Sequence, residues 1–196
     1  MSERTIVGIG GGSAAGKTTL AEAVEDRCDD VTLLSMDDFY SDRSHMTQAE
    51  RARFNFDDPQ TLDWTALFKV TQAIYDGEDV VTKPVYDFET AAVDYEEITI
   101  GNGVVIEGLW ALTQPLVDEQ DFSVYVDAAP DTRLIRRVER DTDERNMDAA
   151  EVVTDFKQNV KPMHDKHVEP TKADADIIVQ GGYQDAAADA IAGVLE

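Results

Sequence analysis

The sequence has little of several features that would place it in a particular class of protein. Cys28 is the only cysteine among 196 residues, so no intramolecular disulfide can form and a reducing cytoplasm is the expected location. No apolar run approaches the roughly 20 residues that span a bilayer, and the first strand-like run begins too close to Met1 to leave room for a signal peptide. With 6 prolines, no linker-like stretch and 42% hydrophobic residues, we expect a single domain over residues 1–196.

Positive charge is also scarce. The chain has 17 Lys and Arg residues against 41 Asp and Glu residues, for a net charge of -24. Such a surface repels nucleic acids and anionic membranes, so we expect neither as a partner. The acidic residues are scattered along the chain rather than gathered in a tail, which is typical of the solvated surface of a halophilic protein.

The most informative segment is residues 5–19, where a β-branched run leads into a glycine-rich loop and then into an amphipathic helix. Gly11 and Gly16 enclose four residues, and Lys17 and Thr18 follow directly. Backbone N–H groups of such a loop hold phosphates, the lysine reaches the β- and γ-phosphate oxygens, and the hydroxyl is placed to bind Mg²⁺. A ligand-free strand-to-helix turn explains this order of features poorly. The predicted nucleotide contacts are Gly11, Gly12, Ser13, Ala14, Ala15, Gly16, Lys17, Thr18 and Thr19.

The rest of the chain alternates short apolar runs with helical patterns. Strands are predicted at 31–35, 104–106, 122–126 and 177–179, and helices at 18–27, 63–75, 131–141, 149–160 and 185–195. This alternation predicts a three-layer α/β fold around a mostly parallel sheet. Residues 80–100 break the rhythm with three short runs, at 80–81, 84–86 and 98–100, which predict a small antiparallel insert at the carboxyl edge of the sheet. Ligands bind at that edge, so the insert is a candidate wall for an acceptor site.

Carboxylates follow two of the predicted strands. Asp37 and Asp38 come after the strand at 31–35, and Glu107 ends the strand that begins at Val104. Carboxylates at these positions can accept a proton or hold a metal ion and its waters, and we assign Asp37 the first role and Glu107, with Thr18, the second. A helix N-cap is the alternative for Asp37, but two carboxylates beside a phosphate loop favour function.

Five of the ten arginines lie between residues 133 and 145. On a helix, Arg133, Arg137 and Arg140 share one face. A solvated charged face is the ordinary explanation. In so acidic a chain, this concentration predicts a lid over residues 133–147 that closes on polyphosphate, because positioned positive charge stabilises a phosphoryl transition state. His164 and His167 are spaced like metal ligands, but the sequence shows no third ligand, so no transition-metal site is expected.

At this point the chain resembles the uridine kinase and phosphoribulokinase family over nearly its full length. The matching segments are 10–13 with 16–19, 35–40, 54–59, 84–88, 106–108, 136–141 with 144–145, 160–164, 169–172 and 175–178. The resemblance implies a P-loop kinase fold that uses ATP and Mg²⁺, with Asp37 as the general base. It further implies substrate contacts from Tyr40, Asp57, Tyr86 and Arg137, and phosphate contacts from Arg140 and Arg145.

The chain departs from uridine kinases where they contact the pyrimidine. The family's usual His and Arg after the Tyr-Asp-Phe segment are Ala91 and Val93, a lid Gly-Arg is Asn146-Met147, and a Gln near the sugar is Asp155. Removing hydrogen-bond partners of a base removes the preference for it. The expected acceptor is therefore ribose 1-phosphate, with Lys83 meeting its phosphate and ribose 1,5-bisphosphate as product. The alternative is a uridine or cytidine kinase, and a homo-oligomer is left open.

Overall fold

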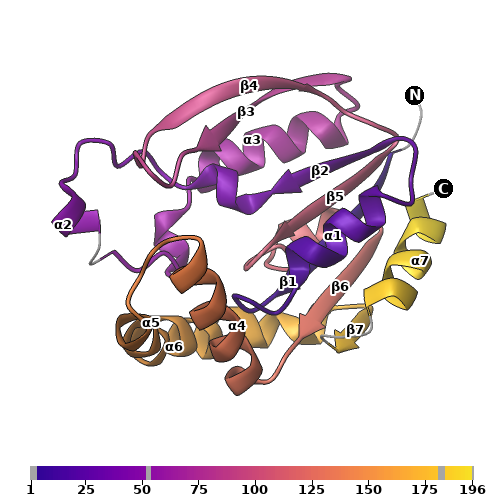
Figure 1. Cartoon of the computed structure of the whole chain (residues 1–196). Coiled ribbons are helices and arrows are strands. Elements are labelled where there is room, and N and C mark those ends of the chain that lie inside the picture. Colours follow the sequence, from indigo (N-terminus) through magenta and orange to yellow (C-terminus); the bar gives the residue numbers. More distant parts are fainter. Residues whose placement is uncertain (1–3, 52–53, 181–183, 196) are drawn as a thin grey trace.

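Five parallel strands form the centre of the molecule (Figure 1) in the computed structural model, which describes residues 4–51, 54–180 and 184–195. Their order across the sheet is β2-β5-β1-β6-β7. All four neighbouring pairs are parallel. The strands are β1 (Thr5–Gly11), β2 (Val31–Ser35), β5 (Gly103–Gly108), β6 (Phe122–Asp127) and β7 (Ile177–Gln180). The predicted parallel sheet and its four later strands are confirmed.

Apolar side chains on both faces of this sheet explain why helices cover each side. Along β1, Val7 and Ile9 pack with Leu20 of α1 (Lys17–Glu25) and Ile191 of α7 (Gln184–Leu195). Ile6, the neighbour of Val7, belongs to a separate core on the opposite face. Successive strand residues point to opposite faces, so the continuous apolar runs predicted a sheet that is buried on both faces.

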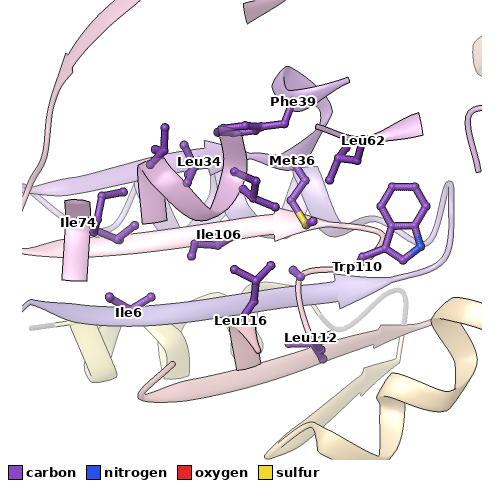
Figure 2. Packing of buried hydrophobic residues seen from close by; sticks show 14 of the residues in the cluster. Ile6, Leu34, Met36, Phe39, Leu62, Ile74, Ile106, Trp110, Leu112 and Leu116 are labelled. Atoms are coloured by element: carbon purple, nitrogen blue, oxygen red, sulfur yellow. The ribbon is translucent and has the colours of Figure 1, made fainter. Parts of the chain in front are cut away.

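The second core packs helix α3 (Trp64–Tyr75) against the sheet (Figure 2). Leu67 and Ile74 of α3 meet Ile106 of β5 in this cluster, which extends to Trp110 and Leu116 in the connection after β5. Asp63 caps α3 by accepting a hydrogen bond from the Ala66 amide at 3.0 Å. Trp110 is buried, and its ring centroid lies 6.2 Å from that of half-buried Trp64.

The insert at 80–100 is an antiparallel hairpin of two strands, β3 (Val80–Tyr86) and β4 (Val93–Thr99), which forms a sheet of its own. The expected antiparallel insert is confirmed, but the expectation of three short strands is wrong. Residues 94–97 of β4 are exposed and carry three carboxylates, so sequence periodicity missed a strand that is held by pairing with β3 rather than by burial of its own side chains.

The predicted lid is helix α4 (Pro130–Asp143), which precedes α5 (Ala149–Asp155) (Figure 1). The helix predicted at 149–160 is corrected: α5 ends at Asp155, and helical turns continue to Asp174, with π-type turns at Phe156–Val160 and His164–Val168 on either side of α6 (Lys161–Met163). A short helix, α2 (Gln48–Arg51), lies between β2 and α3. None of the helices in the described ranges is long and apolar enough to span a bilayer.

Candidate active site

The glycine-rich loop joins β1 to α1, in the strand-loop-helix order that the sequence predicted. Gly11, Ala14 and Gly16 all adopt positive φ angles, of 141°, 60° and 107°. A side chain at Gly11 would place its Cβ 2.4 Å from the Val126 carbonyl oxygen, so the loop needs glycine there for space as well as for φ. Gly16 caps α1, and the next residues, Lys17 and Thr18, begin the helix.

Lys17 lies at the centre of the site. Its side chain is buried, and its Nζ donates a hydrogen bond to the Gly12 carbonyl at 3.1 Å. Burial lowers the pKa of the ammonium, whereas the charges of Glu107, Asp37 and Asp57 raise it. The charges of the three carboxylates therefore favour the charged form of the lysine.

Two of those carboxylates lie at the ends of neighbouring strands, Glu107 in β5 and Asp37 in the turn after β2. Ser35 of β2 pairs in register with Glu107 of β5, and the Ser35 hydroxyl donates a hydrogen bond to Glu107 Oε1 at 2.8 Å. The same hydroxyl accepts a bond from the Asp37 amide at 3.3 Å, which caps the 3₁₀ turn Met36–Phe39. Ser35 is thus the cap of this turn, and the alternative of Asp37 as an N-cap is not supported.

The Asp37 carboxylate is solvent-exposed but crowded by protein. Desolvation raises its pKa, an effect that the charges of Lys17, Arg145 and Arg140 oppose and that contact with water reduces. Burial also raises the pKa of Glu107, and hydrogen bonds from Ser35 and Thr18 lower it. The structure therefore brings Lys17, Asp37 and Glu107 together at the carboxyl edge of the sheet.

The oxygen atoms of Thr18 and Glu107 suit the magnesium ion that the sequence analysis assigned to them. The two side chains interact directly, the Thr18 side chain is solvent-exposed, and a hydroxyl with a carboxylate is the hard oxygen donor set that Mg²⁺ prefers. A magnesium ion that keeps most of its water needs only one or two such protein ligands. The residues present fit the ion.

The arginines of α4 face the protein rather than solvent. Arg133 is 1% exposed, and Arg137 and Arg140 are also partly or largely covered, while Ile135 and Glu139 are exposed instead. A solvated arginine face is therefore not what the structure has. Arg136, which the sequence analysis did not assign, donates to the Ala15 carbonyl of the loop at 3.0 Å.

Arg137 connects the phosphate loop with the predicted ribose contacts. Its Nη1 donates to Ser13 Oγ at 2.8 Å and lies 3.6 Å from Asp57 Oδ2. Its Nη2 donates to Asp155 Oδ2 at 3.1 Å. Asp57 is buried, which raises its pKa, and the charge of Arg137 opposes that shift. Asp155 thus ties Arg137 in place by an ion pair.

Four aromatic rings form a cluster beside these polar groups. The ring centroid of Tyr40 lies 5.3 Å from that of Phe56, 5.5 Å from that of Tyr86 and 5.8 Å from that of Phe88. The Tyr40 hydroxyl donates to the Phe56 carbonyl at 3.0 Å, and the nearby charges of Asp37 and Asp57 add to the desolvation that raises its pKa. The predicted substrate residues Tyr40, Asp57 and Tyr86 are therefore neighbours of Asp37 or of one another.

Lys83 has a different environment from the one expected. Its Nζ lies 2.7 Å from Asp38 Oδ2 and 2.8 Å from Glu96 Oε1, and its side chain is 8% exposed. Two carboxylates already neutralise this ammonium, so a contact with a substrate phosphate would require breaking these ion pairs. The Asp38 pair instead fastens hairpin β3–β4 to the turn that carries Asp37, and the Glu96 pair joins the two strands of the hairpin.

One residue that converges on the site was missed. Asp141 follows Arg140 directly, is 1% exposed, and forms ion pairs with Arg137, Arg140 and Arg145. The available signal was an acidic residue on the face of the predicted helix that carries the arginines, four residues from Arg137 and four from Arg145.

Comparison with known proteins agrees with this geometry. A uridine kinase from Staphylococcus epidermidis is 37% identical over 200 residues, covering 96% of this chain and 94% of the relative. One from Halobacterium salinarum is 36% identical over 180 residues, covering 90% and 80%. Among solved structures, a putative fructose transport system kinase from Silicibacter has a TM-score of 0.71 at 18% identity, covering 91% of this chain and 90% of that one. Phosphoribulokinase from Rhodobacter spheroides has a TM-score of 0.68 at 15% identity, covering 92% and 71%.

The two similar structures show only the fold, whereas the sequence matches also show the family. Residues 6–188 match the model of the phosphoribulokinase and uridine kinase family. With the phosphate loop, the strand-end carboxylates and the inward-facing arginines in place, the chain belongs to the phosphoribulokinase/uridine kinase family, a family of phosphotransferases.

Proposed function

We propose that this protein transfers the γ-phosphate of ATP to the 5-hydroxyl of a ribosyl compound, and that uridine or cytidine is the acceptor. The observation that carries the kinase proposal is the placement of Asp37 beside Lys17 of the phosphate loop. The relatives named uridine kinase, at 36–37% identity over at least nine-tenths of the chain, support a nucleoside ahead of the ribose 1-phosphate that the sequence departures favoured.

The donor half of the reaction needs positive charge and backbone N–H groups around the phosphates. The loop from Gly11 to Thr19 supplies the amides, and Lys17 places its ammonium where charge develops on the β- and γ-phosphate oxygens. Thr18 and Glu107 are the residues that would hold Mg²⁺, which neutralises phosphate charge when bound.

In the acceptor half, Asp37 accepts the proton of the attacking hydroxyl. The hydroxyl oxygen forms a bond to the γ-phosphorus, the bond from that phosphorus to the β,γ-bridging oxygen breaks, and ADP leaves with that electron pair. Lys17 and the lid arginines Arg140 and Arg145 counter the negative charge around Asp37, which keeps its pKa from rising further and favours the ionised base at neutral pH.

The same proposal assigns the ribose and base contacts. Asp57 and Arg137 would hold ribose hydroxyls, because a carboxylate and a guanidinium offer complementary hydrogen-bonding groups at the edge of the phosphate loop. The rings of Tyr40, Tyr86 and Phe88 offer an apolar surface against which a flat base would pack.

Ribose 1-phosphate is a second candidate, and a specific observation favours it. Ala91, Val93 and Met147 stand where uridine kinases place groups that hydrogen-bond to the pyrimidine, and none of their side chains can do so. Ala91 is also buried, at 1% exposure, with a φ angle of 58°. If no other residue reads the base, the enzyme should not prefer nucleosides.

A coupled assay of ADP release tests both proposals. Uridine, cytidine, adenosine, ribose 1-phosphate and ribulose 5-phosphate would be compared by kcat/KM with ATP and Mg²⁺ in molar KCl, with Asp37→Asn as the inactive control. A higher kcat/KM for uridine or cytidine than for every pentose phosphate supports the first proposal, and the reverse order supports the second. No turnover of any ribosyl acceptor would overturn both.

A further inference from the structure

Asp141 occupies an unusual position for a carboxylate in this chain. It lies in the last turn of α4, on the same side of the helix as the arginines, and its side chain is 1% exposed. Its oxygens meet three guanidinium groups: Oδ1 accepts from Arg140 Nε at 2.8 Å and lies 3.5 Å from Arg145 Nη1, and Oδ2 lies 3.3 Å from Arg137 Nε. A buried carboxylate requires such compensation.

The three arginines repel one another. Desolvation lowers the pKa of Arg145, and the charges of Arg140 and Arg137 lower it further, while Asp141 raises it. Arg137 is also held by Asp155, so loss of the Asp141 charge should above all release Arg140 and Arg145, whose flexible side chains are 33% and 46% exposed and repel each other. Asp141 is therefore what keeps Arg140 and Arg145 beside Arg137.

Each arginine also faces a different part of the site. Arg137 reaches Ser13 of the phosphate loop and Asp57. Arg145 lies with its Cζ 5.8 Å from the ring centroid of Phe88, in the connection between β3 and β4, and its charge acts on Asp37 together with that of Arg140. The Asp141 carboxylate thus links cations that lie beside the phosphate loop, act on Asp37 and approach Phe88.

We propose that Asp141 is a positioning residue for phosphoryl transfer: its buried carboxylate holds Arg137, Arg140 and Arg145 in one cluster around Asp37 and the phosphate loop. This proposal rests on the proposed kinase function. Asp141 acts through the arginines, since their guanidinium groups stand between it and the loop. Its contribution is to orientation, which the transition state requires more than nucleotide binding does.

The test variant is Asp141→Asn, which keeps the shape of the side chain and removes the charge. We expect kcat to fall about tenfold or more, while KM for ATP and the affinity for ADP measured by calorimetry do not weaken, because three uncompensated cations still attract phosphates. In ¹⁵N spectra, the Arg140 Nε–H signal should lose part of its protection from solvent exchange, because a neutral amide oxygen is a weaker acceptor than a carboxylate. An unchanged kcat would overturn the proposal.

A double-mutant cycle with Arg145→Met separates positioning from general damage. If Asp141 acts through Arg145, the loss caused by Asp141→Asn should be smaller in the Arg145→Met background than in the wild type. If the factors by which the two substitutions lower kcat simply multiply in the double mutant, the two residues act independently and the shared action is overturned. Asp189→Asn is the matched control, because Asp189 of α7 forms an exposed ion pair with Arg27 just beyond the far end of α1, and its removal should leave kcat unchanged.

A conservative replacement keeps the test decisive if Asp141→Asn does not fold. Asp141→Glu retains the charge but moves it by one methylene, so kcat should fall about threefold or more with the melting temperature within a few degrees of the wild type. An unchanged kcat in a folded Asp141→Glu protein would overturn the proposal. If the wild type itself phosphorylates no ribosyl acceptor, the proposed function fails instead, and the Nε–H measurement still reports whether Asp141 holds Arg140.

Discussion

At the scale of single residues, the roles of the site depend on which charges lie next to one another. The Asp37 carboxylate is exposed and does not cap its own turn, because the Ser35 hydroxyl accepts the capping hydrogen bond. Lys17 is buried among carboxylates, and Lys83 is held by two of them. The side-chain types were visible in the sequence, but the pairing of Lys83 with Asp38 across 45 positions of the chain was not.

The first prediction concerns Asp37. Asp37→Asn should lower kcat by about 10²-fold, because the attacking hydroxyl loses its base, while the affinity for ATP stays within a factor of a few. Since the pKa of Asp37 is raised above its usual 3.8, protonation at falling pH should produce an acidic limb in kcat/KM above that value, and this limb should be absent in the variant. Near-normal turnover of Asp37→Asn would contradict the assignment.

A second prediction concerns Lys83, whose two ion pairs suggest a structural role. Lys83→Met should lower kcat/KM for nucleosides and pentose phosphates by the same factor, because the variant loosens the turn that carries Asp37. It should also lower the free energy of unfolding by about 1–2 kcal/mol, since the two carboxylates then repel each other and remain partly hydrated. A loss confined to phosphorylated acceptors would instead support Lys83 as a phosphate contact.

At the scale of elements, the connections between strands and helices carry the function. The loop between β1 and α1 depends on glycine because its first residue approaches the Val126 carbonyl of β6. Helix α4 is placed with its charged face inward, and hairpin β3–β4 is joined to the turn after β2 by Lys83. These elements are recognisable in sequence, but their mutual orientation depends on contacts between distant segments.

The third prediction tests the loop itself. Gly11→Ala should lower the unfolding free energy by about 2 kcal/mol or more and abolish ATP binding, because alanine at a φ of 141° is strained and its Cβ meets a backbone oxygen. Gly193→Ala in α7 is the control: a Cβ there would meet nothing within 4 Å beyond the backbone of its own helix, and alanine favours a helix by roughly 1 kcal/mol. Thermal unfolding of both variants, with and without ADP, provides the measurement, and a Gly11→Ala protein that binds ADP normally would contradict this account.

At the scale of the whole molecule, the net charge of -24 dominates behaviour in solution. The inward-facing arginines of α4 are paired with Asp57, Asp141 and Asp155, so these pairs largely cancel and the excess of carboxylates remains on the outer surface. Self-repulsion of such a surface destabilises the compact state in dilute buffer.

The fourth prediction follows from that repulsion. Raising KCl from about 0.1 M to 1 M shortens the Debye length from about 10 Å to 3 Å, so both the melting temperature and the turnover rate should increase over that range. Calorimetry and the coupled assay at matched pH provide the measurement. Comparison with NaCl separates ionic strength from an effect specific to potassium, and a flat profile would contradict a salt-adapted surface.

The sequence by itself determined the local features of this protein. The phosphate loop, the strands of the parallel sheet and the carboxylates at 37 and 107 follow from spacing and periodicity, which act over a few residues. Where local patterns were weak, prediction failed: β4 is exposed and charged, and the helical stretch after α5 contains π-type turns. Only the tertiary structure decided that Lys83 pairs with Asp38 and that three arginines converge on Asp141, because strand register and helix packing bring together charges that local sequence patterns do not pair.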